Sequence, residues 1–295
     1  MSQSNRLLIT GADGFTGRYV WDAAIAAGYE PVAPLAGFDL LSPESCQNTV
    51  EDARPDYLIH LAALSFVAHP DQSALYSVNT VGTQNLLQAV HNSGRSLKKI
   101  IVASSANVYG NVPVGQQPIT ERQPPAPVNH YAASKLAMEY MVHTWFDKLP
   151  IIITRPFNYT GDGQAEHFLI PKLVKHFAER LPSISLGNLN VARDYSDVRD
   201  LANDYVWLLD SSLEGAGATI NMCSGKSYAL SGILELLQEL TNHSIAVVSD
   251  KSLTRENEIT AIQGASVMWL PQSKHLANRR EFKDTLSWML KTMKI

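Results

Sequence analysis

The chain of 295 residues is poor in cysteine. Its only two cysteines, Cys46 and Cys223, stand far apart. Neither lies in the short spacing by which cysteine and histidine hold a metal, and two isolated cysteines form no disulfide framework. The sequence therefore predicts reduced thiols, a cytoplasmic location and chemistry that needs no metal.

Long apolar runs and an excess of one charge are also lacking. No stretch approaches the ~20 apolar residues that a membrane-spanning helix needs, and the opening MSQSNR does not resemble a signal peptide. The formal net charge is −4 and the pI is about 6.1. Such a balance gives no basic footprint for nucleic acid or an anionic membrane, so neither is an expected partner.

Strand-like and helix-like stretches alternate over the first half of the chain. Near-continuous apolar runs such as KKIIVAS are typical of parallel strands covered on both faces. The alternation predicts an α/β fold with a doubly wound, Rossmann-type parallel sheet and right-handed crossovers. The expected strands are 6–10, 30–33, 57–61, 98–103 and 151–155, and the expected helices are 15–27, 43–53, 74–92 and 129–148.

The alternation loosens after Pro156, where FNYTGDGQ and LGNLNVARDYSD have the composition of polar loops. A helix at 198–211, a strand at 219–222 and a helix at 231–241 are expected beyond them. The proline-rich residues 113–129 predict a long loop, and loops of that length often serve as functional lids.

A glycine-rich segment, GADGFTG, connects the first expected strand to the first expected helix. A strand, a glycine turn and a helix N-terminus form the usual cradle for a pyrophosphate. The spacing of Gly11, Gly14 and Gly17 is G-x-x-G-x-x-G, one residue longer than G-x-G-x-x-G. Three glycines would also suit a flexible N-terminal loop, but the flanking strand and helix favour a nucleotide site.

Tyr131 and Lys135, in NHYAASK, are four residues apart and share one face of a helix. An ammonium close to a phenol favours the phenolate, so a group with a pKa of ~10 can exchange protons near neutrality. Ser105, after the strand 98–103, could hold the oxygen that gains or loses this proton. Such a trio suits interconversion of a ketone and an alcohol with hydride from a cofactor. The spacing alone also fits an ordinary helix pair; the order of the motifs along the chain favours catalysis.

Six motifs occur in order along nearly the whole chain: GADGFTG, HLAA, VNTVGTQNLL, SSANVYG, YAASK and RPFNYTGDGQ. Together they resemble the extended short-chain dehydrogenase/reductase family. Within it, LGNLNVARDYSDVRD, INMCSGK and TRENEI are similar to reductases and dehydratases of GDP-linked 6-deoxyhexoses, above all to those that reduce GDP-4-keto-6-deoxy-D-mannose. The resemblance implies an NAD(P)-binding domain of residues 1–156 plus about 196–220. It implies a smaller C-terminal nucleotide-sugar domain of residues 157–195 and 221–295.

The resemblance also implies roles for residues. Tyr131 would donate the proton, Lys135 would lower its pKa and hold the nicotinamide ribose, and Ser105 would orient the substrate carbonyl. Further implied cofactor-binding residues are Gly11, Gly14, Phe15, Thr16, Gly17, Arg18, Asp39, Leu40, Leu61, Ala62, Ala63 and Asn79.

The implied substrate ligands, besides Ser105, lie in the second half of the chain. Asn158 would face the sugar nucleotide, and Glu258 would contact the nucleoside ribose. Arg193 and Arg255 would bind the diphosphate, since a guanidinium fork matches phosphate oxygens. A surface ion pair is the alternative for each arginine.

Departures from the family pattern narrow the reaction. Ala106 and Asn107 stand where family dehydratases carry Asp and Glu, and Ala106 replaces the cysteine of epimerase-reductases. Neither side chain does acid–base work, so simple reduction at C4 to GDP-D-rhamnose or its C4 epimer is expected. Asp162 and Glu256 add carboxylates to the expected substrate motifs, which leaves the nucleotide base and the sugar open.

The cofactor and the alternatives complete these expectations. The second strand runs out at Ala33 and Leu35 without the acidic residue typical of an NAD site, and Arg18 could meet a 2′-phosphate, so NADP(H) is favoured over NAD(H). Asp39 resembles an adenine-contacting aspartate or caps a turn.

Three alternative functions stay open: an NDP-hexose 4-epimerase, a reductase of CDP- or dTDP-linked ketosugars and an inactive nucleotide-binding scaffold. A homodimer through helices 74–92 and 129–148 is implied by the resemblance.

Overall fold

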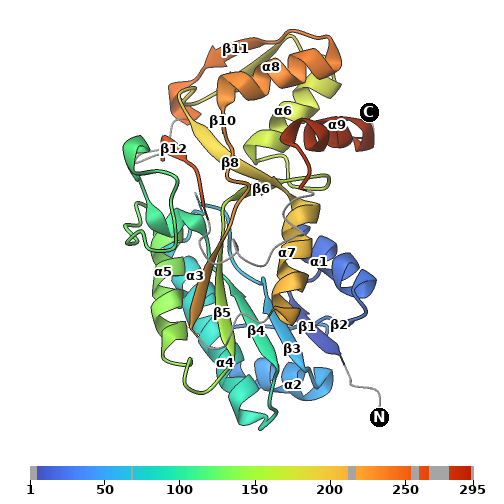
Figure 1. Ribbon diagram of the computed structural model, residues 1–295, viewed down its shortest axis with the longest axis vertical. Helices are drawn as coiled ribbons and strands as arrows, with labels where there is room; N and C mark the ends of the chain where they lie inside the picture. Colours follow the sequence, from blue (N-terminus) through green and yellow to red (C-terminus); the bar gives the residue numbers. More distant parts are fainter. Residues whose placement is uncertain (1–4, 68, 212–216, 254–258, 266–278, 294–295) are drawn as a thin grey trace. The chain divides into compact units, whose positions relative to one another are not determined.

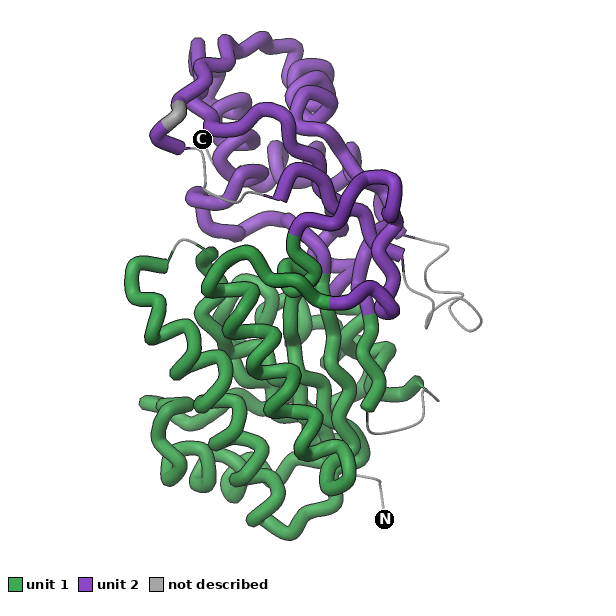
Figure 2. The backbone as a smooth tube through the Cα atoms, turned by 90° about the vertical axis from the view of Figure 1, so that its left-hand side faces the viewer, with its two compact units in different colours: residues 1–110, 125–156, 202–220 green, residues 111–124, 157–201, 221–295 purple. Residues whose placement is uncertain are grey.

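The computed structural model describes residues 5–67, 69–211, 217–253, 259–265 and 279–293. The chain forms two compact units, coloured separately in Figure 2. Unit 1 comprises residues 1–110, 125–156 and 202–220, and unit 2 comprises residues 111–124, 157–201 and 221–295. Residues 111–124 and 196–201, which we expected in the nucleotide-binding domain, therefore belong to unit 2.

A six-stranded sheet forms the centre of unit 1, in the order β2-β1-β3-β4-β5-β9 (Figure 1). Its first five strands pair in parallel, so the doubly wound parallel fold is confirmed. The strands are β1 (Arg6–Thr10), β2 (Glu30–Val32), β3 (Tyr57–His60), β4 (Lys99–Ala103), β5 (Ile151–Pro156) and β9 (Ala218–Met222).

The order of the sheet reverses between β1 and β3, because β2 pairs on one side of β1 while β3, β4 and β5 follow on the other. Such a switch point leaves a crevice at the carboxyl ends of the two strands, where open α/β sheets bind ligands. The segments that leave β1 and β3 begin at Gly11 and Leu61. Two of the motifs found in the sequence therefore flank the switch point.

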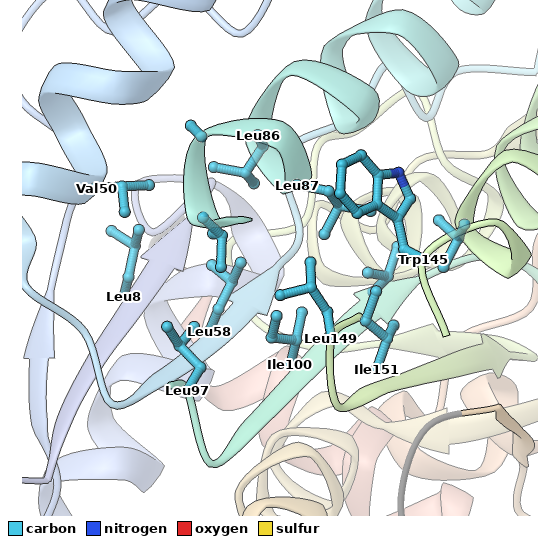
Figure 3. Close-up of a cluster of buried hydrophobic side chains, with 14 of the residues drawn as sticks. Leu8, Val50, Leu58, Leu86, Leu87, Leu97, Ile100, Trp145, Leu149 and Ile151 are labelled. Atoms are coloured by element: carbon cyan, nitrogen blue, oxygen red, sulfur yellow. The ribbon is translucent and has the colours of Figure 1, made fainter. Parts of the chain in front are cut away.

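Helices cover the sheet, and one face is filled by apolar side chains from α2, α4 and α5 (Figure 3). Leu58, Ile100 and Ile151 from the strands contact this cluster, as do Leu86 and Trp145 from the helical side. The helices are α1 (Phe15–Ala26), α2 (Pro43–Ala53), α3 (Gln72–Tyr76), the π-helical η1 (Ser77–Gly82), α4 (Thr83–Asn92), the 3₁₀ turn η2 (Ala106–Tyr109), α5 (His130–His143) and α7 (Val198–Asp210).

The single helix expected at 74–92 is in fact three segments, α3, η1 and α4. Its middle turn is a π-helix, a feature that is frequent at functional sites. Asn79, within this turn, is tied through its side chain to Leu64 and to Ser134 of α5. These hydrogen bonds to two other segments stabilise the π-helical turn. Their partners lie 15 and 55 residues away, so the local helical pattern does not predict the turn.

Unit 2 contains two small sheets around its own apolar core. Strand β8 pairs antiparallel with β10 and parallel with β6 and β12, and β7 pairs parallel with β11. The elements are β6 (Asn158–Thr160), α6 (Leu169–Ala178), β7 (Ser183–Leu186), β8 (Ala192–Asp197), β10 (Ser227–Ala229), α8 (Leu230–Thr241), β11 (Ala246–Ser249), β12 (Ala261–Ile262), α9 (Phe282–Thr292) and the 3₁₀ turns η3 (Val114–Gln116) and η4 (Lys251–Leu253).

The prediction of polar loops around residues 157–164 and 186–197 was wrong in part, because β6 and β8 occupy 158–160 and 192–197 and pair with each other, whereas 161–164 and 187–191 are loops. Two carboxylates of β8, those of Asp194 and Asp197, are buried and have hydrogen-bond partners. The carboxylate of Asp194, fully buried, accepts hydrogen bonds from the backbone N–H groups of Ser224, Gly225 and Gly264 and from the Ser224 hydroxyl, at 2.6–3.0 Å. A buried charge satisfied in this way stabilises a strand that looks polar in sequence.

The expected loop 113–129 is confirmed apart from the short η3 turn and an isolated bridge between Ile119 and Gly264. Within the described ranges, the structure contains no helix long and apolar enough to cross a membrane.

Candidate active site

The glycine turn after β1 is packed too closely for other residues. Gly11 has φ of +72°, and a Cβ there would lie 2.9 Å from the backbone nitrogen of Ala62. A Cβ on Gly17 would lie 2.0 Å from the Gly11 carbonyl oxygen and 2.7 Å from the Cα of Ala12. Both positions therefore require glycine, which lets the turn lie flat against the start of α1 and the segment after β3.

The turn leads directly into the N-terminus of α1. Gly14 is the N-cap and offers no side-chain cap, and the first turn contains no acidic residue. The positive end of the helix dipole therefore faces the turn without a carboxylate of its own helix, which suits an anion such as a diphosphate. Arg18, one turn further on, is exposed.

Two of the expected cofactor-binding residues, Asp39 and Leu40, lie in the segment after β2. Asp39 is exposed, and its Oδ1 accepts a hydrogen bond from the backbone N–H of Leu41 at 2.9 Å. This geometry is that of a turn-capping aspartate, which was one of the two expected roles. The side chain of Leu40 is buried in the core of unit 1.

Behind the switch point lies a buried chain of polar groups that the sequence did not reveal as a network. His60 Nδ1 lies 2.6 Å from the hydroxyl oxygen of Thr10, and its Nε2 lies 2.9 Å from that of Thr83. Since the Thr83 hydroxyl donates to the Asn79 carbonyl at 2.7 Å, it accepts from Nε2–H, and Nδ1 accepts from Thr10. Burial, reinforced by the charge of Lys135, lowers the pKa of His60 to about 3, so the imidazole is neutral.

Asn79 connects this network to the helix of Tyr131. Its Oδ1 accepts from the Leu64 N–H at 2.9 Å, and its Nδ2 donates to the Leu64 carbonyl at 3.1 Å and to the Ser134 hydroxyl at 3.0 Å. Ser134 in turn donates to the carbonyl of Tyr131 at 2.8 Å. Asn79 thus fixes both the segment after β3, with Leu61, Ala62 and Ala63, and the first turn of α5.

Helix α5 presents Tyr131 and Lys135 on one buried face. Asn129 starts the helix, because its side-chain oxygen accepts from the N–H of Ala132 at 2.8 Å, and this cap places Tyr131 in the first turn. Tyr131 is 7% and Lys135 4% exposed. The ammonium of Lys135 donates to the carbonyl of Ala103, the last residue of β4, at 2.9 Å. The structure therefore brings Lys135 to the strand end that carries Ser105.

The electrostatics of this face suit proton transfer. Burial lowers the pKa of Lys135 to about 8, and the Glu139 carboxylate one turn further along α5 opposes that effect. Ser105 is 7% exposed, and its hydroxyl oxygen accepts from the N–H of Asn107 at 3.2 Å. This hydrogen bond uses a lone pair of the hydroxyl oxygen, so the hydroxyl hydrogen can still be donated to another group.

Unit 2 contains a cavity of about 290 Å³. Two of the expected substrate ligands, Asn158 at the start of β6 and Arg193 on β8, line it. Arg193 donates to the carbonyls of Ala192 and Thr260 at 3.0 and 3.2 Å. The other lining residues are Tyr159, Gln164, His167, Phe168, Leu169, Ile170, Lys172, Leu186, Gly187, Asn188, Val191, Tyr195, Leu230 and Leu253.

The charged side chains among these lining residues are Lys172 and Arg193, and the described lining includes no carboxylate. The cavity is therefore suited to an anionic ligand. Lys172 was missed because α6 was not expected, whereas the segment Gly187–Asn188 lies in a motif that carried the resemblance but was given no role. Arg255 and Glu258 lie outside the described residues.

A parallel sheet with a glycine turn at its switch point, together with a buried tyrosine–lysine pair, defines a dinucleotide-dependent α/β oxidoreductase. The model of the "NAD dependent epimerase/dehydratase family" matches residues 7–223. The chain belongs to this family, the extended short-chain dehydrogenases/reductases, as its motifs predicted.

Two relatives cover most of the chain. A GDP-6-deoxy-D-talose 4-dehydrogenase of Aggregatibacter actinomycetemcomitans is 33% identical over 262 residues, which are 88% of this chain and 88% of the relative. A GDP-6-deoxy-D-mannose reductase of Pseudomonas aeruginosa is 34% identical over 274 residues, 89% of this chain and 88% of the relative. A solved structure of RMD from Pseudomonas aeruginosa complexed with NADPH has a TM-score of 0.88 at 31% identity and covers 98% of both chains.

These similarities confirm an NAD(P)-dependent enzyme of nucleotide sugars. The structure fits such a cofactor on its own terms, since the tightly packed glycine turn leads into the N-terminus of α1, whose first turn carries no acidic residue.

Proposed function

We propose that the protein reduces the C4 ketone of an NDP-4-keto-6-deoxyhexose, with GDP-4-keto-6-deoxy-D-mannose as its substrate and GDP-D-rhamnose or its C4 epimer as the product. The observation that carries the proposal is the buried face of α5, which carries Tyr131 and Lys135 and from which Lys135 donates to the carbonyl of Ala103, at the strand end that precedes Ser105. The names of the two relatives, both of which refer to GDP-6-deoxyhexoses, support the choice of sugar nucleotide.

In this proposal, each of the three residues has one task. The cofactor, when bound, supplies the hydride that C4 accepts. Ser105 donates its hydroxyl hydrogen to the ketone oxygen and so orients it. Tyr131 gives its phenolic proton to the same oxygen as negative charge develops there, and the ammonium of Lys135 stabilises the phenolate that remains. One hydride and one proton together convert the ketone to an alcohol.

The surroundings of Ser105 favour reduction over the neighbouring chemistries of the family. Ala106 and Asn107 form the start of the η2 turn that follows Ser105, and Ala106 is buried. A methyl group and an amide supply no base for removing a proton from the sugar carbons. Dehydration and inversion next to the ketone therefore lack a catalyst at these two positions.

Recognition of the nucleotide is proposed for the cavity of unit 2. Arg193 and Lys172 would pair with the diphosphate, because both are cationic side chains of the cavity wall. Arg18 would contact the 2′-phosphate of NADP(H), which makes NADP(H) the proposed cofactor. We further propose a cytoplasmic location and a homodimer through the segments 74–92 and 129–148; Val81 and Tyr140, which are 53% and 61% exposed in them, support the dimer.

The test is oxidation of reduced nicotinamide, followed by absorbance, with GDP-4-keto-6-deoxy-D-mannose and either NADPH or NADH. The proposal expects faster oxidation of NADPH and a GDP-6-deoxyhexose whose C4 configuration NMR assigns. An Arg18→Ala variant should lose the preference for NADPH. Failure to oxidise either cofactor rejects the GDP substrate and directs the assay to CDP- and dTDP-linked ketosugars.

A 4-epimerase is the second candidate, favoured by the breadth of the family to which the chain belongs. Purified protein that carries NAD and interconverts C4 epimers without added cofactor would establish it in place of the reductase.

A further inference from the structure

A buried ion pair lies directly behind the proposed catalytic residues. Arg155 on β5 donates to the carboxylate of Glu139 on α5 through Nε at 2.9 Å and through Nη2 at 2.5 Å. The two side chains are 8% and 1% exposed. Because burying two charges costs about as much as their attraction returns, such a pair is weak evidence of a contribution to stability. A role in the proposed active site explains the position of this ion pair better.

The pair contacts both flanks of Ser105. The hydroxyl of Ser104 donates to Glu139 Oε1 at 2.5 Å. Arg155 Nη1 donates to the hydroxyl of Tyr109 at 2.9 Å, and its guanidinium carbon lies 4.8 Å from the centre of that ring. Ser104 precedes Ser105, and Tyr109 ends the η2 turn that Ser105 begins. One ion pair therefore links the end of β4, the η2 turn, α5 and β5.

The same pair supplies the charge that Lys135 faces along α5. Glu139 follows Lys135 by four residues and so lies on the same face of the helix. From the other elements, Lys135 faces the neutral His60 of β3 and the carbonyl of Ala103 on β4. Glu139 is thus the carboxylate that opposes the burial of Lys135. Arg155 is the cationic partner of this carboxylate inside the protein.

We propose that Glu139 and Arg155 are positioning residues for the reduction, which hold Ser105 against α5 and provide the negative charge opposite Lys135. The inference rests on the proposed function in that it assigns the reaction to Ser105, Tyr131 and Lys135. It adds two residues that touch neither the substrate nor the cofactor in this scheme and act through their neighbours.

Two small changes test the positioning. Ser104→Ala and Tyr109→Phe each remove one hydroxyl from the pair and leave the charges in place. We expect kcat to fall about tenfold in each, as misplacement of a catalytic group does, with the Kd for NADPH unchanged. The matched control is Tyr205→Phe, whose buried hydroxyl is bonded to Thr154 of the same strand β5. Wild-type kcat in both test variants would overturn the positioning role.

A charge change tests the second part of the proposal, the effect of the Glu139 charge on Lys135, without any substrate. Glu139→Gln should lower the pH at which Lys135 loses its proton, measured by NMR titration of the lysine Cε signal that Lys135→Met removes. The double variant Glu139→Gln with Arg155→Met removes one negative and one positive charge, so the net charge of the pair stays zero. The midpoint of Lys135 should therefore return toward its wild-type value. Glu239→Gln, at an exposed ion pair with Lys283, should leave it unchanged.

The two readouts separate the possible failures. An unchanged Lys135 midpoint in Glu139→Gln overturns the charge assignment, whatever substrate the enzyme uses. If wild-type protein reduces no ketosugar while the Lys135 midpoint shifts as expected, the proposed function fails and the electrostatic link between Glu139 and Lys135 stands. If Glu139→Gln does not fold, the kcat values of Ser104→Ala and Tyr109→Phe decide.

Discussion

The two units surround their candidate functional groups in different ways. In unit 1, Ser105, Tyr131 and Lys135 are at most 7% exposed, and hydrogen bonds tie Ser105 and Lys135 to backbone groups of Asn107 and Ala103. In unit 2, Asn158 is exposed and Arg193 half-buried on the wall of an open cavity. Proton transfer gains from fixed geometry and low dielectric, whereas recognition of a charged ligand needs groups that the ligand can reach. Changes to Ser105, Tyr131 or Lys135 should therefore act on kcat, and changes to Asn158 or Arg193 on KM.

Lys135→Met is the largest expected break in unit 1. It removes the cation that stabilises the Tyr131 phenolate and keeps a side chain of similar length, so kcat should fall by ~10²-fold or more. Steady-state kinetics with NADPH and the ketosugar measure the loss. Lys148→Met, an exposed lysine shortly after the same helix, should retain wild-type kcat. Equal losses in the two variants would contradict the assignment.

Gly17→Ala separates cofactor binding from chemistry within unit 1. The added Cβ would lie 2.0 Å from the Gly11 carbonyl oxygen, so the turn must move and the Kd for NADPH should rise about tenfold or more. Fluorescence titration of NADPH measures it. Gly232→Ala, in helix α8 with nothing within 4 Å of its new Cβ, should leave the Kd unchanged and raise stability by about 0.5 kcal/mol. A wild-type Kd in Gly17→Ala would show that the turn does not hold the cofactor.

Arg193→Ala tests the recognition side of the comparison. Loss of a charge-assisted bond to the diphosphate should raise KM for the sugar nucleotide about tenfold, with kcat nearly constant. Lys283→Ala, an exposed cation of unit 2 away from the lining residues, serves as the control. A fall in kcat at unchanged KM would place Arg193 in the chemistry and remove the distinction between the units.

His60→Gln should act on the pH dependence of stability. The pKa of buried His60 is about 3, against 6.5 for an ordinary histidine, so between these values the unfolded chain binds more protons. Stability contributed by neutral His60 is present above pH about 6.5 and is lost as the pH falls toward 3, by at most ~1.4 kcal/mol per pH unit. The variant should unfold more easily in urea at pH 7 but lose less stability on acidification. An unchanged pH dependence of stability in His60→Gln would contradict this account.

The same contrast explains which parts of the fold the sequence predicted. Parallel strands covered on both faces are apolar throughout, as the fully buried Leu7, Leu8 and Ile9 show. In β8, by contrast, Asp194 and Asp197 are buried against partners such as Ser224 and Thr285, which are 30 and 88 residues away. A local pattern does not contain such partners, so the sequence alone predicts a loop at the position of this strand.

The sequence did not predict helix α6 either. Its sequence, LIPKLVKHFA, carries a proline at the third position, where a helix tolerates it because the first backbone N–H groups have no partner within the helix. Three of its apolar residues, Leu173, Val174 and Phe177, are buried in the core of unit 2. The proline thus lies close to the helix start, where it does not break the helix.

The candidate site was predicted unevenly. Tyr131 and Lys135 followed from a four-residue spacing, and Ser105 from its place after a strand, since one helix turn and one strand end suffice to align them. The pairing of Glu139 with Arg155 could not be predicted in this way, because it joins a helix to the following strand across 16 residues. Only the packing of α5 against the sheet brings the two together.

Tyr131→Phe gives the most direct test of the central claim that unit 1 performs the proton transfer. The measurement is turnover of GDP-4-keto-6-deoxy-D-mannose by this variant and by wild type, with the Kd for NADPH determined on the same preparations. Loss of a general acid should cut turnover by ~10²-fold or more and leave NADPH binding intact. Wild-type turnover by Tyr131→Phe would contradict the account.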